Sequence, residues 1–408
     1  MFHADPIRRA LAHALIPLFA LPLIAGCERQ TTPSATTAPT KGTTTTTTDV
    51  GKAPAGGEIL VGHFTSLTGS EATWGVSTDN GVQMAVAEAN AQGGVNGRSI
   101  KVITYDDQGK QQEAATAVTR LITQDQVVAV LGEVASSRSL AGGALAQRFG
   151  VPMISPSSTN PKVTEIGDMI FRVCFIDPFQ GYACAKFARG EPLKAQKVAT
   201  LFNRSQIYSA GLNDTFKQHF TDMGGTITTE QAYADGDTDF SAQLTNIRET
   251  QPDVIFIPGY YTEVVNIARQ ARRLGLTLPL LGGDGWDAED LKNAGDALDG
   301  CCFSNHYCHD EQRPVVRDFV QRYQAAHNRV PDGMAATGYD AARILIDAMR
   351  RAKSLGGKDL AAAIAETKDF AGVTGIITMD AQRNARKPVV IVRVQGGKQS
   401  YVTSIAPP

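Results

Sequence analysis

Residues 127–161 read VVAVLGEVASSRSLAGGALAQRFGVPMISPSSTNP, and this stretch decides the fold class. The apolar run Val127–Leu131 predicts a strand, the segment around Leu140–Phe149 a helix, and Val151–Ile154 a second strand. Continuous apolar strands that alternate with helices of this length are typical of a parallel sheet covered on both faces. We therefore predict an α/β fold around this unit.

The alternation of strands and helices continues on both sides of this stretch. Further strands are predicted at Ile59–Phe64, Ile100–Tyr105, Val198–Phe202, Val254–Ile257 and Leu278–Leu281. The pattern restarts after an irregular stretch near residues 175–180, so the sequence predicts two doubly wound parallel-sheet lobes with a cleft between them. The tail is predicted to form helices, the second near Ala341–Ala352, and to end in two strands at 375–378 and 389–394.

Length and charge exclude some classes of protein. The chain has 408 residues, which as a prior indicates two or three domains. It carries 39 basic and 41 acidic residues, and this net charge of -2 argues against a nucleic-acid-binding protein. No apolar run reaches the about 18 residues that a membrane-spanning helix needs, which excludes a polytopic membrane protein.

The N-terminal 57 residues read as a targeting segment and a linker. Arg8 and Arg9 precede an apolar run that ends in small residues before Cys27, so residues 1–27 resemble a bacterial lipoprotein signal peptide with lipidation at that Cys. An ordinary signal peptide with an incidental Cys is the alternative. Residues 28–57 are rich in Thr and predict a disordered tether. We expect a lipid-anchored protein on the periplasmic or cell-surface side, with the choice of membrane open.

Signals for catalysis are weak. The sequence contains no phosphate-binding G-x-x-x-x-G-K-S/T, H-E-x-x-H or G-x-S-x-G motif. Cys302, His306 and Cys308 share a strand face and offer metal-binding side chains, but their spacing matches no zinc pattern. We expect no enzymatic activity, no cofactor and no metal.

Five cysteines remain once Cys27 is set aside. In an oxidising compartment some pairing is expected, and five leaves one Cys over. A Cys174–Cys184 bridge and a bridge within Cys301, Cys302 and Cys308 are the alternatives, and the connectivity stays open.

The loops that follow two neighbouring strands carry hydroxyl groups. Ser136 and Ser137 come after the strand that ends at Leu131, and Ser157 and Thr159 come after the strand that ends at Ile154. Hydroxyls and free N–H groups at a helix start bind anions such as a carboxylate, although simple helix capping is the alternative.

The second series of strands supplies an acid and aromatic residues. Asp284 lies in the segment GGDGW, and Tyr208 and the pair Tyr260–Tyr261 also follow strands. An acid among glycines can pair with an ammonium, and a turn-forming Asp is the alternative. Carboxylate donors on one lobe and an acid on the other predict a zwitterion held across the cleft.

Several motifs resemble the branched-chain amino acid-binding protein family of ABC importers, which has the type I periplasmic binding fold. They run in order over about residues 58–400 and are the segments Gly69–Gly75, Asn90–Arg98, Tyr105–Gln108, Val151–Thr159 and Gly259–Tyr261. The resemblance implies two lobes joined by a three-stranded hinge, crossed near Cys174, His306 and Val373. The N-terminal lobe is then 58–174 plus 307–373, and the C-terminal lobe is 175–306 plus 374–408.

The resemblance also implies roles for individual residues. Ser137, with Ser136 as a neighbour, matches the carboxylate-binding Ser, and Asp284 matches the acid that binds the ammonium. The remaining implied ligand-binding residues are Trp74, Ser157, Thr159, Tyr208, Tyr260 and Tyr261. Asp284 is one methylene shorter than the family's Glu, and Arg138 adds a positive charge that suits a second carboxylate, so aliphatic specificity does not follow.

The function that the resemblance implies is solute binding without chemistry. The protein would capture an amino acid or a similar small zwitterion and deliver it to ABC transporter permease subunits. The alternative is a sensor of the same fold that binds an amide or an amino acid and signals to a partner.

Overall fold

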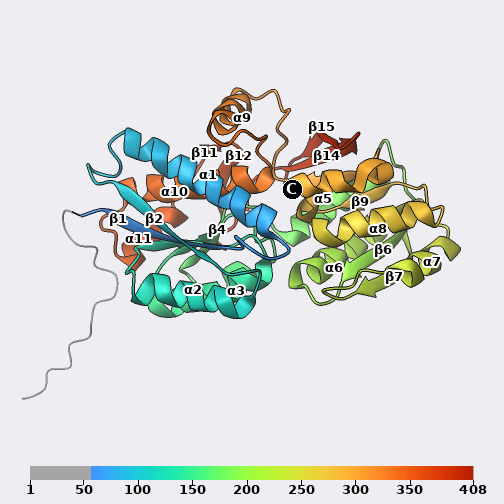
Figure 1. Cartoon of the computed structure of the whole chain (residues 1–408), viewed down its shortest axis with the longest axis horizontal. Helices are drawn as coiled ribbons and strands as arrows, with labels where there is room; N and C mark the ends of the chain where they lie inside the picture. The colour runs from blue at the N-terminus through green and yellow to red at the C-terminus, as the bar shows by residue number, and fades with distance from the viewer. Residues whose placement is uncertain (1–56, 408) are drawn as a thin grey trace, which may run out of the picture. The chain divides into compact units, whose positions relative to one another are not determined.

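The computed structural model describes residues 57–407. The predicted signal peptide with Cys27 lies outside the described residues, as does nearly all of the predicted tether. Among the described helices, none is long and apolar enough to cross a membrane. The described residues belong to one compact unit with two lobes (Figure 1).

The first lobe is built on a five-stranded parallel sheet with the order β2-β1-β3-β4-β5. Its strands are β1 Ile59–Thr65, β2 Ile100–Asp106, β3 Ala129–Leu131, β4 Met153–Ser155 and β5 Ile170–Arg172. Every residue of β3 and β4 is buried, as their continuous apolar sequence predicts.

Helices cover both faces of this sheet (Figure 1). The pair α1 Ala72–Ala91 and α10 Gly333–Arg351 covers one face, and α2 Gln111–Thr123 and α3 Ser136–Phe149 cover the other. A Cβ at Gly81 of α1 would lie 2.1 Å from the carbonyl oxygen of Ala335, so only glycine permits the close approach of α1 and α10. The remaining helices of this lobe are α4 Lys162–Glu165, α9 Pro314–His327 and α11 Gly357–Ala365.

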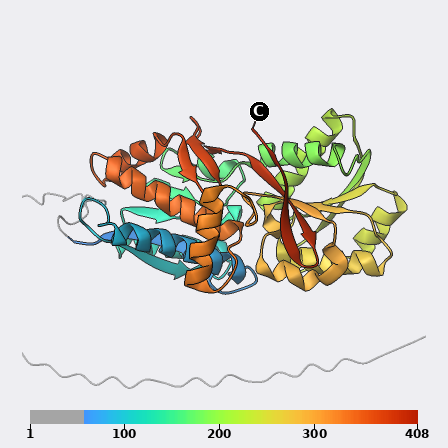
Figure 2. The ribbon, with the colours of Figure 1, turned by 90° about the horizontal axis from the view of Figure 1, so that it is seen from above.

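The second lobe contains a seven-stranded sheet with the order β15-β14-β10-β9-β8-β6-β7. Its strands are β6 Lys197–Asn203, β7 Thr226–Tyr233, β8 Val254–Ile257, β9 Leu280–Gly282, β10 Cys302–Asn305, β14 Val389–Gln395 and β15 Lys398–Ile405. The first five are parallel, and β14 and β15 add antiparallel at the edge, where they form the dark red C-terminal hairpin (Figure 2). The helices are α5 Asp177–Arg189, α6 Ile207–Asp222, α7 Ser241–Glu249, α8 Tyr261–Arg273, η1 Asp284–Trp286 and η2 Glu289–Leu298.

A small sheet changes the expected lobe boundary near the C-terminus. It consists of β11 Phe370–Gly372, β12 Gly375–Met379 and β13 Ala385–Arg386. We expected the chain to leave the first lobe near Val373, but Ile377, Met379 and Ala385 lie in the core of that lobe. Alternate residues of β12 point into this core, so the chain leaves the first lobe later, near Lys387.

The other two passages between the lobes lie at Cys174 and His306. Val173 packs in the first core and Phe175 in the second. Likewise Phe303 packs in the second core and Tyr307 in the first. Each passage therefore spans only a few residues.

The five cysteines of the described residues are all free and buried, so the expected disulfides are absent from this part of the chain. Two of the thiols instead donate weak hydrogen bonds, Cys174 to the carbonyl of Ser158 at 3.3 Å and Cys184 to the hydroxyl of Ser304 at 3.3 Å. Burial raises the pKa of both thiols to about 12, which keeps them protonated and inert.

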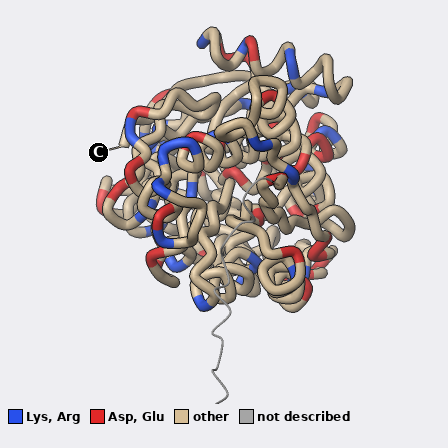
Figure 3. The backbone as a smooth tube through the Cα atoms, turned by 90° about the vertical axis from the view of Figure 1, so that its left-hand side faces the viewer, with Lys and Arg blue, Asp and Glu red and all other residues tan. Residues whose placement is uncertain are grey.

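Positions with Lys or Arg and positions with Asp or Glu are interspersed along the described chain (Figure 3). This distribution agrees with the net charge of -2.

Candidate binding site between the lobes

The two lobes meet around a cavity of about 10 Å³. The lining residues are Trp74, Val134, Ala135, Ser136, Ser157, Thr159 and Met334 from the first lobe and Tyr208, Tyr260, Asp284 and Gly285 from the second. Most of them follow the carboxyl ends of parallel strands, where doubly wound sheets bind ligands. A cavity of this size holds about one water molecule, so the lobes are closed on each other.

Hydroxyl groups and a helix start form the first-lobe side of the cavity. Ser136 is the first residue of α3, and its Oγ accepts a hydrogen bond from the backbone N–H of Asn160 at 3.2 Å. Ser157 Oγ shares a hydrogen bond of 2.7 Å with Thr337 Oγ1 of α10, and buried Thr159 lies beside it. The first-turn N–H groups of a helix have no acceptor within the helix, so this side suits an anion.

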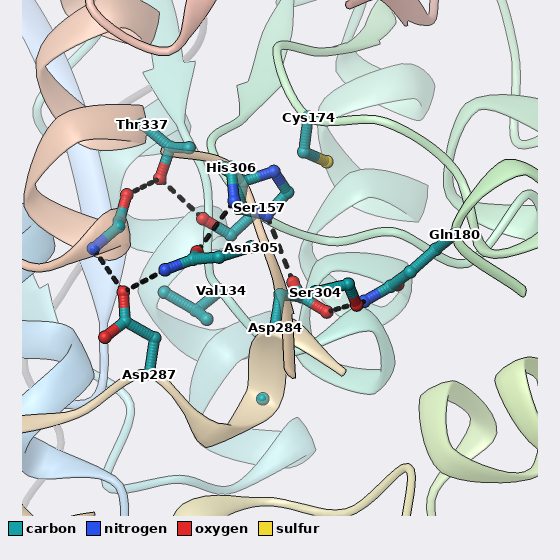
Figure 4. Close-up of polar contacts among 12 residues, drawn as sticks. Val134, Ser157, Cys174, Gln180, Asp284, Asp287, Ser304, Asn305, His306 and Thr337 are labelled. Carbon is teal, nitrogen blue, oxygen red and sulfur yellow. Dashed lines mark hydrogen bonds and ion pairs between the residues drawn. The ribbon is translucent and has the colours of Figure 1, made fainter. Parts of the chain in front are cut away.

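Asp284 forms the second-lobe side and accepts hydrogen bonds from three elements. Gln180 Nε2 of α5 lies 2.7 Å from its Oδ1, and Tyr208 OH of α6 lies 2.9 Å from the same oxygen. His306 Nε2 lies 3.1 Å from Oδ2 (Figure 4). These contacts fix the buried carboxylate beside the cavity.

The glycines around Asp284 permit this close packing. A Cβ at Gly282 would lie 2.0 Å from the indole of Trp286, and one at Gly283 would lie 2.3 Å from Tyr208 OH. The segment GGDGW therefore brings the backbone against two aromatic side chains, which is the structural reason for its composition.

The groups that hold Asp284 bring it little positive charge. Burial, together with the charge of Asp284, raises the pKa of Tyr208 well above its ordinary value. Burial lowers the pKa of His306, although the hydrogen bond to Asp284 opposes this effect. Both side chains are thus neutral donors at neutral pH, and within the described chain His306 is the only basic side chain within 4 Å of this carboxylate. The site leaves a negative charge without a cation, which suits an ammonium group.

Aromatic rings form a wall of the cavity. Trp74 packs edge-on against Tyr260, with ring centroids 4.7 Å apart, and Tyr208 stacks on Tyr260 at 5.5 Å. Tyr261 packs on the outer side of Trp74 at 5.0 Å and donates from its OH to the carbonyl of Ser70. The rings of Trp74, Tyr208 and Tyr260 thus line one side of the cavity.

Direct hydrogen bonds join the lobes around the cavity. Trp74 Nε1 donates to the carbonyl of Asp287 at 2.8 Å, and Thr73 Oγ1 donates to Asp290 Oδ2 at 2.5 Å. The carboxylate of Asp287 also accepts a hydrogen bond from the N–H of Gly333 at the start of α10, at 2.6 Å. A ligand that contacts both sides would add to these closed-state contacts.

Arg138 does not reach the cavity, contrary to the expectation that it suits a second carboxylate. Its guanidinium pairs with Glu71 at 2.6 Å, Glu133 at 3.1 Å and Asp107 at 4.0 Å. Burial raises the pKa of Glu133 to about 7, although the charge of Arg138 opposes this effect. The charge of Arg138 is already balanced inside the first lobe.

The structure brings seven of the nine residues expected from the sequence to the cavity: Trp74, Ser136, Ser157, Thr159, Tyr208, Tyr260 and Asp284. Ser137 is half-buried one position further along α3 and does not line the cavity, because the turn of the helix points it elsewhere. Tyr261 lies behind Trp74 and is likewise outside the lining.

Some residues of the site are missing from the sequence-based prediction. Met334 lies in the lining because α10 begins at Gly333, eight residues before the predicted helix start, with Asp332 as its N-cap. The Asp-Gly pair at 332–333, ahead of an apolar run, is the sequence signal that could have predicted this helix start. Gln180 and His306 carry no local signal, because their contacts with Asp284 span 104 and 22 positions of sequence.

The candidate metal-binding side chains of segment 301–309 make other contacts in the structure. Among the described residues there is no group of three or more His, Cys, Asp or Glu side chains placed to hold a metal ion. His306 instead contacts Asp284, and Cys308 packs in the second core.

Comparisons with known proteins agree with this architecture. Residues 58–399 match the family model described as "Periplasmic binding protein". The Leu/Ile/Val-binding protein homolog 2 of Brucella abortus is 31% identical over 351 residues, which cover 84% of this chain and 93% of that protein.

Solved structures show the same fold over nearly their whole length. The leucine binding protein LivK from Thermotoga maritima has a TM-score of 0.82 and 38% identity, covering 86% of this chain and 99% of that one. LivJ from Streptococcus pneumoniae, in complex with isoleucine, has a TM-score of 0.81 and 32% identity, covering 86% of this chain and 100% of that one. The chain therefore belongs to the periplasmic binding protein family, and the three relatives named here are described as branched-chain amino acid-binding proteins.

Proposed function

We propose that this protein binds an L-amino acid or a similar small zwitterion between its lobes and delivers it to the permease subunits of an ABC importer. The observation that carries the proposal is the buried Asp284 carboxylate, held by neutral donors and facing the start of α3 across one cavity. A charge that is buried without a cation is costly unless a ligand supplies one.

Each end of the zwitterion has a proposed partner. The ligand carboxylate would bind the hydroxyls of Ser136, Ser157 and Thr159 and the free N–H groups at the start of α3. The ammonium would bind Asp284. The side chain would then lie along the aromatic wall, beside Trp74.

An apolar ligand side chain is supported by the rest of the lining. Val134 and Met334 join Trp74 and Tyr260 around the cavity and offer no charged group. The relatives named for leucine and bound to isoleucine have the same fold at more than 30% identity. Because Asp284 is shorter than the family's Glu, the ligand would sit closer to the second lobe or bind through a water molecule.

We also propose that Cys27 carries a lipid anchor that holds the protein to a membrane on the periplasmic or cell-surface side. The support is the apolar run and the small residues before this Cys. A Cys27→Ala variant should leave the membrane fraction or retain its signal peptide, which mass spectrometry of the purified protein detects. An unchanged membrane association and N-terminus would contradict the anchor.

A thermal-shift screen of the purified protein tests the binding function. The panel is the twenty L-amino acids, with isovalerate as a carboxylate without an ammonium and isoamylamine as an amine without a carboxylate. A ligand at about 100 times its Kd adds roughly 2.7 kcal/mol to the free energy of unfolding, which raises the midpoint by a few degrees. We expect a shift with at least one amino acid and none with either half-ligand.

A shift with isovalerate equal to that with the amino acids would contradict the ammonium role of Asp284. No shift with any amino acid would contradict the proposed ligand class.

A further inference from the structure

His306 stands out among the residues that hold Asp284, because it lies at a passage between the lobes. It follows β10 directly, its side chain is fully buried, and its ring lies 4.1 Å from the ring of Phe175 at the first passage. Its Nε2 lies 3.1 Å from Asp284 Oδ2 (Figure 4). One imidazole therefore connects the hinge to the proposed ammonium-binding acid.

The contacts of the ring define its tautomer. An ionised carboxylate only accepts hydrogen bonds, so Nε2 must carry the proton that points to Asp284. Nδ1 is buried and has no hydrogen-bond partner within the described residues. A neutral ring with Nε2–H satisfies this arrangement, and Nδ1 is the position where a second proton would add.

The charged groups around the ring come from two segments. Asp284 and Asp287 face it from the loop after β9 and favour the protonated ring, whereas Lys387 faces it from the third passage and disfavours it. Burial outweighs the two acids and lowers the pKa of His306 below its ordinary value. The ring is therefore neutral at neutral pH, and acid can protonate it.

We propose that His306 is a positioning residue that aims the Asp284 carboxylate at the ligand's ammonium and that, once protonated, competes with the ammonium for this carboxylate. The inference rests on the proposed function of Asp284. A neutral imidazole holds the short Asp side chain in place without cancelling its charge, together with Gln180 and Tyr208. An imidazolium would supply the positive charge that the ligand otherwise brings and would repel the ammonium.

Proton competition gives the sign of the pH dependence. Ligand binding places a positive charge beside the ring and lowers its pKa further, so binding expels the proton. Affinity is full above the pKa of the ring in the free protein and falls as the pH drops below it, by at most about tenfold per pH unit.

Calorimetric titration with L-isoleucine between pH 5 and pH 8 tests the inference. His306→Gln keeps an amide N–H that can donate to Asp284 but cannot be protonated. We expect the affinity of the wild type to fall between pH 7.5 and pH 5, and the affinity of His306→Gln to fall clearly less over the same range. His306→Leu, which removes the donor, should bind at least about tenfold more weakly than the wild type at pH 7.5.

His63→Gln is the matched control. His63 is also fully buried but contacts the carbonyl of Leu131 at 3.1 Å, within the first sheet. This variant should keep the pH dependence of the wild type. Asp177, whose pKa burial raises to about 7 beside Asp284, is present in every variant, so its contribution cancels from the comparison.

The outcomes separate the two proposals. An amino acid that binds with the same pH dependence in the wild type and in His306→Gln overturns the role of His306 alone. No binding of L-isoleucine at any pH overturns the proposed function for this ligand, and the inference with it. If His306→Gln does not fold, spectra of ¹³C-labelled histidine in the wild type decide: the pKa of His306 must fall when L-isoleucine binds, and an unchanged pKa contradicts the inference.

Discussion

The molecule contains two buried charged clusters, one beside the cavity and one inside the first lobe, and they are built in opposite ways. Asp284 in the second lobe is surrounded by donors that are neutral at neutral pH. Arg138 in the first lobe is surrounded by three carboxylates, those of Glu71, Glu133 and Asp107. One cluster keeps an unbalanced charge next to the cavity, and the other balances its charge internally.

The difference separates a binding group from a structural one. A buried ion without a counter-ion is unfavourable on its own, and a ligand of opposite charge relieves that cost. A buried ion with counter-ions is already satisfied and gains little from a ligand. Both residues look like ligand-binding charges in the sequence, but only Asp284 has this property in the structure.

The largest expected effect is on stability, in the balanced cluster. Arg138→Met removes the cation but keeps the aliphatic stem, and it leaves Glu71, Glu133 and Asp107 buried together. We expect the free energy of unfolding to fall by about 3–5 kcal/mol, measured by urea denaturation. Arg351→Met, at a partly exposed ion pair with Asp347, is the control and should change it by less than about 1 kcal/mol.

If Arg138→Met lowers the free energy of unfolding by less than about 1 kcal/mol, the Arg138 cluster does not depend on its cation for stability. That result would contradict the difference between the two clusters.

The next largest effect is expected from a substitution that balances the charge of Asp284. Gln180→Lys places an ammonium beside Asp284, where Gln180 Nε2 now lies 2.7 Å from Oδ1. We expect the Kd for L-isoleucine to rise on the order of 100-fold, because the lysine takes the place of the ligand's ammonium. Isothermal titration calorimetry measures it.

Gln180→Met is the matched control for that experiment, since it removes the donor without adding charge. It should weaken binding by about tenfold or less. Equal losses in the Lys and Met variants would mean that charge balance at Asp284 is not what binding requires.

A smaller effect concerns pH and the balanced cluster. Folding raises the pKa of Glu133 from 4.5 to about 7, so the folded protein takes up a proton between these values and stability falls as the pH rises through this window. Glu133→Gln removes this contribution. Between pH 5 and pH 7.5, the free energy of unfolding of this variant should therefore fall by on the order of 1 kcal/mol less than that of the wild type.

Asp177 and Asp332, whose pKa values burial also raises to about 7, remain in both proteins. If the pH dependence of stability is the same in Glu133→Gln as in the wild type, Glu133 does not contribute to it, and this prediction is wrong.

The smallest effect separates two neighbouring serines at the start of α3. Ser136→Ala removes a hydroxyl that lines the cavity and should weaken L-isoleucine binding about three- to tenfold. Ser137→Ala should change the Kd by less than about twofold. The reverse order would show that the lobes close differently around the ligand.

The two-lobed α/β fold could be predicted because it rests on local patterns. Continuous apolar strands such as β3 and β4 and the helices between them have signals within about 20 residues. The end of the first lobe could not, because β12 gives the same alternating pattern whichever core it faces. Only the packing of Ile377 and Met379 decides that it belongs to the first lobe.

The site, like the fold, has some features with a local sequence signal and others that depend on packing. Asp284 and Ser136 follow strands and are visible as loop residues in the sequence. The neutral surroundings of Asp284 and the carboxylates around Arg138 depend on contacts such as Gln180–Asp284 and Glu71–Arg138, between residues far apart in the chain. Whether a charge is free or balanced is a property of the packed structure, so the sequence could not distinguish the two.

The central claim is that the Asp284 carboxylate binds the ammonium of the ligand. Calorimetric titration of the wild type and Asp284→Asn with L-isoleucine at pH 7.5 tests it most directly, because Asn keeps the shape and removes the charge. We predict a rise in Kd of about 100-fold or more in Asp284→Asn, while the melting temperature without ligand stays the same or rises as a buried unbalanced charge is lost. A Kd within about threefold of the wild type would contradict the claim.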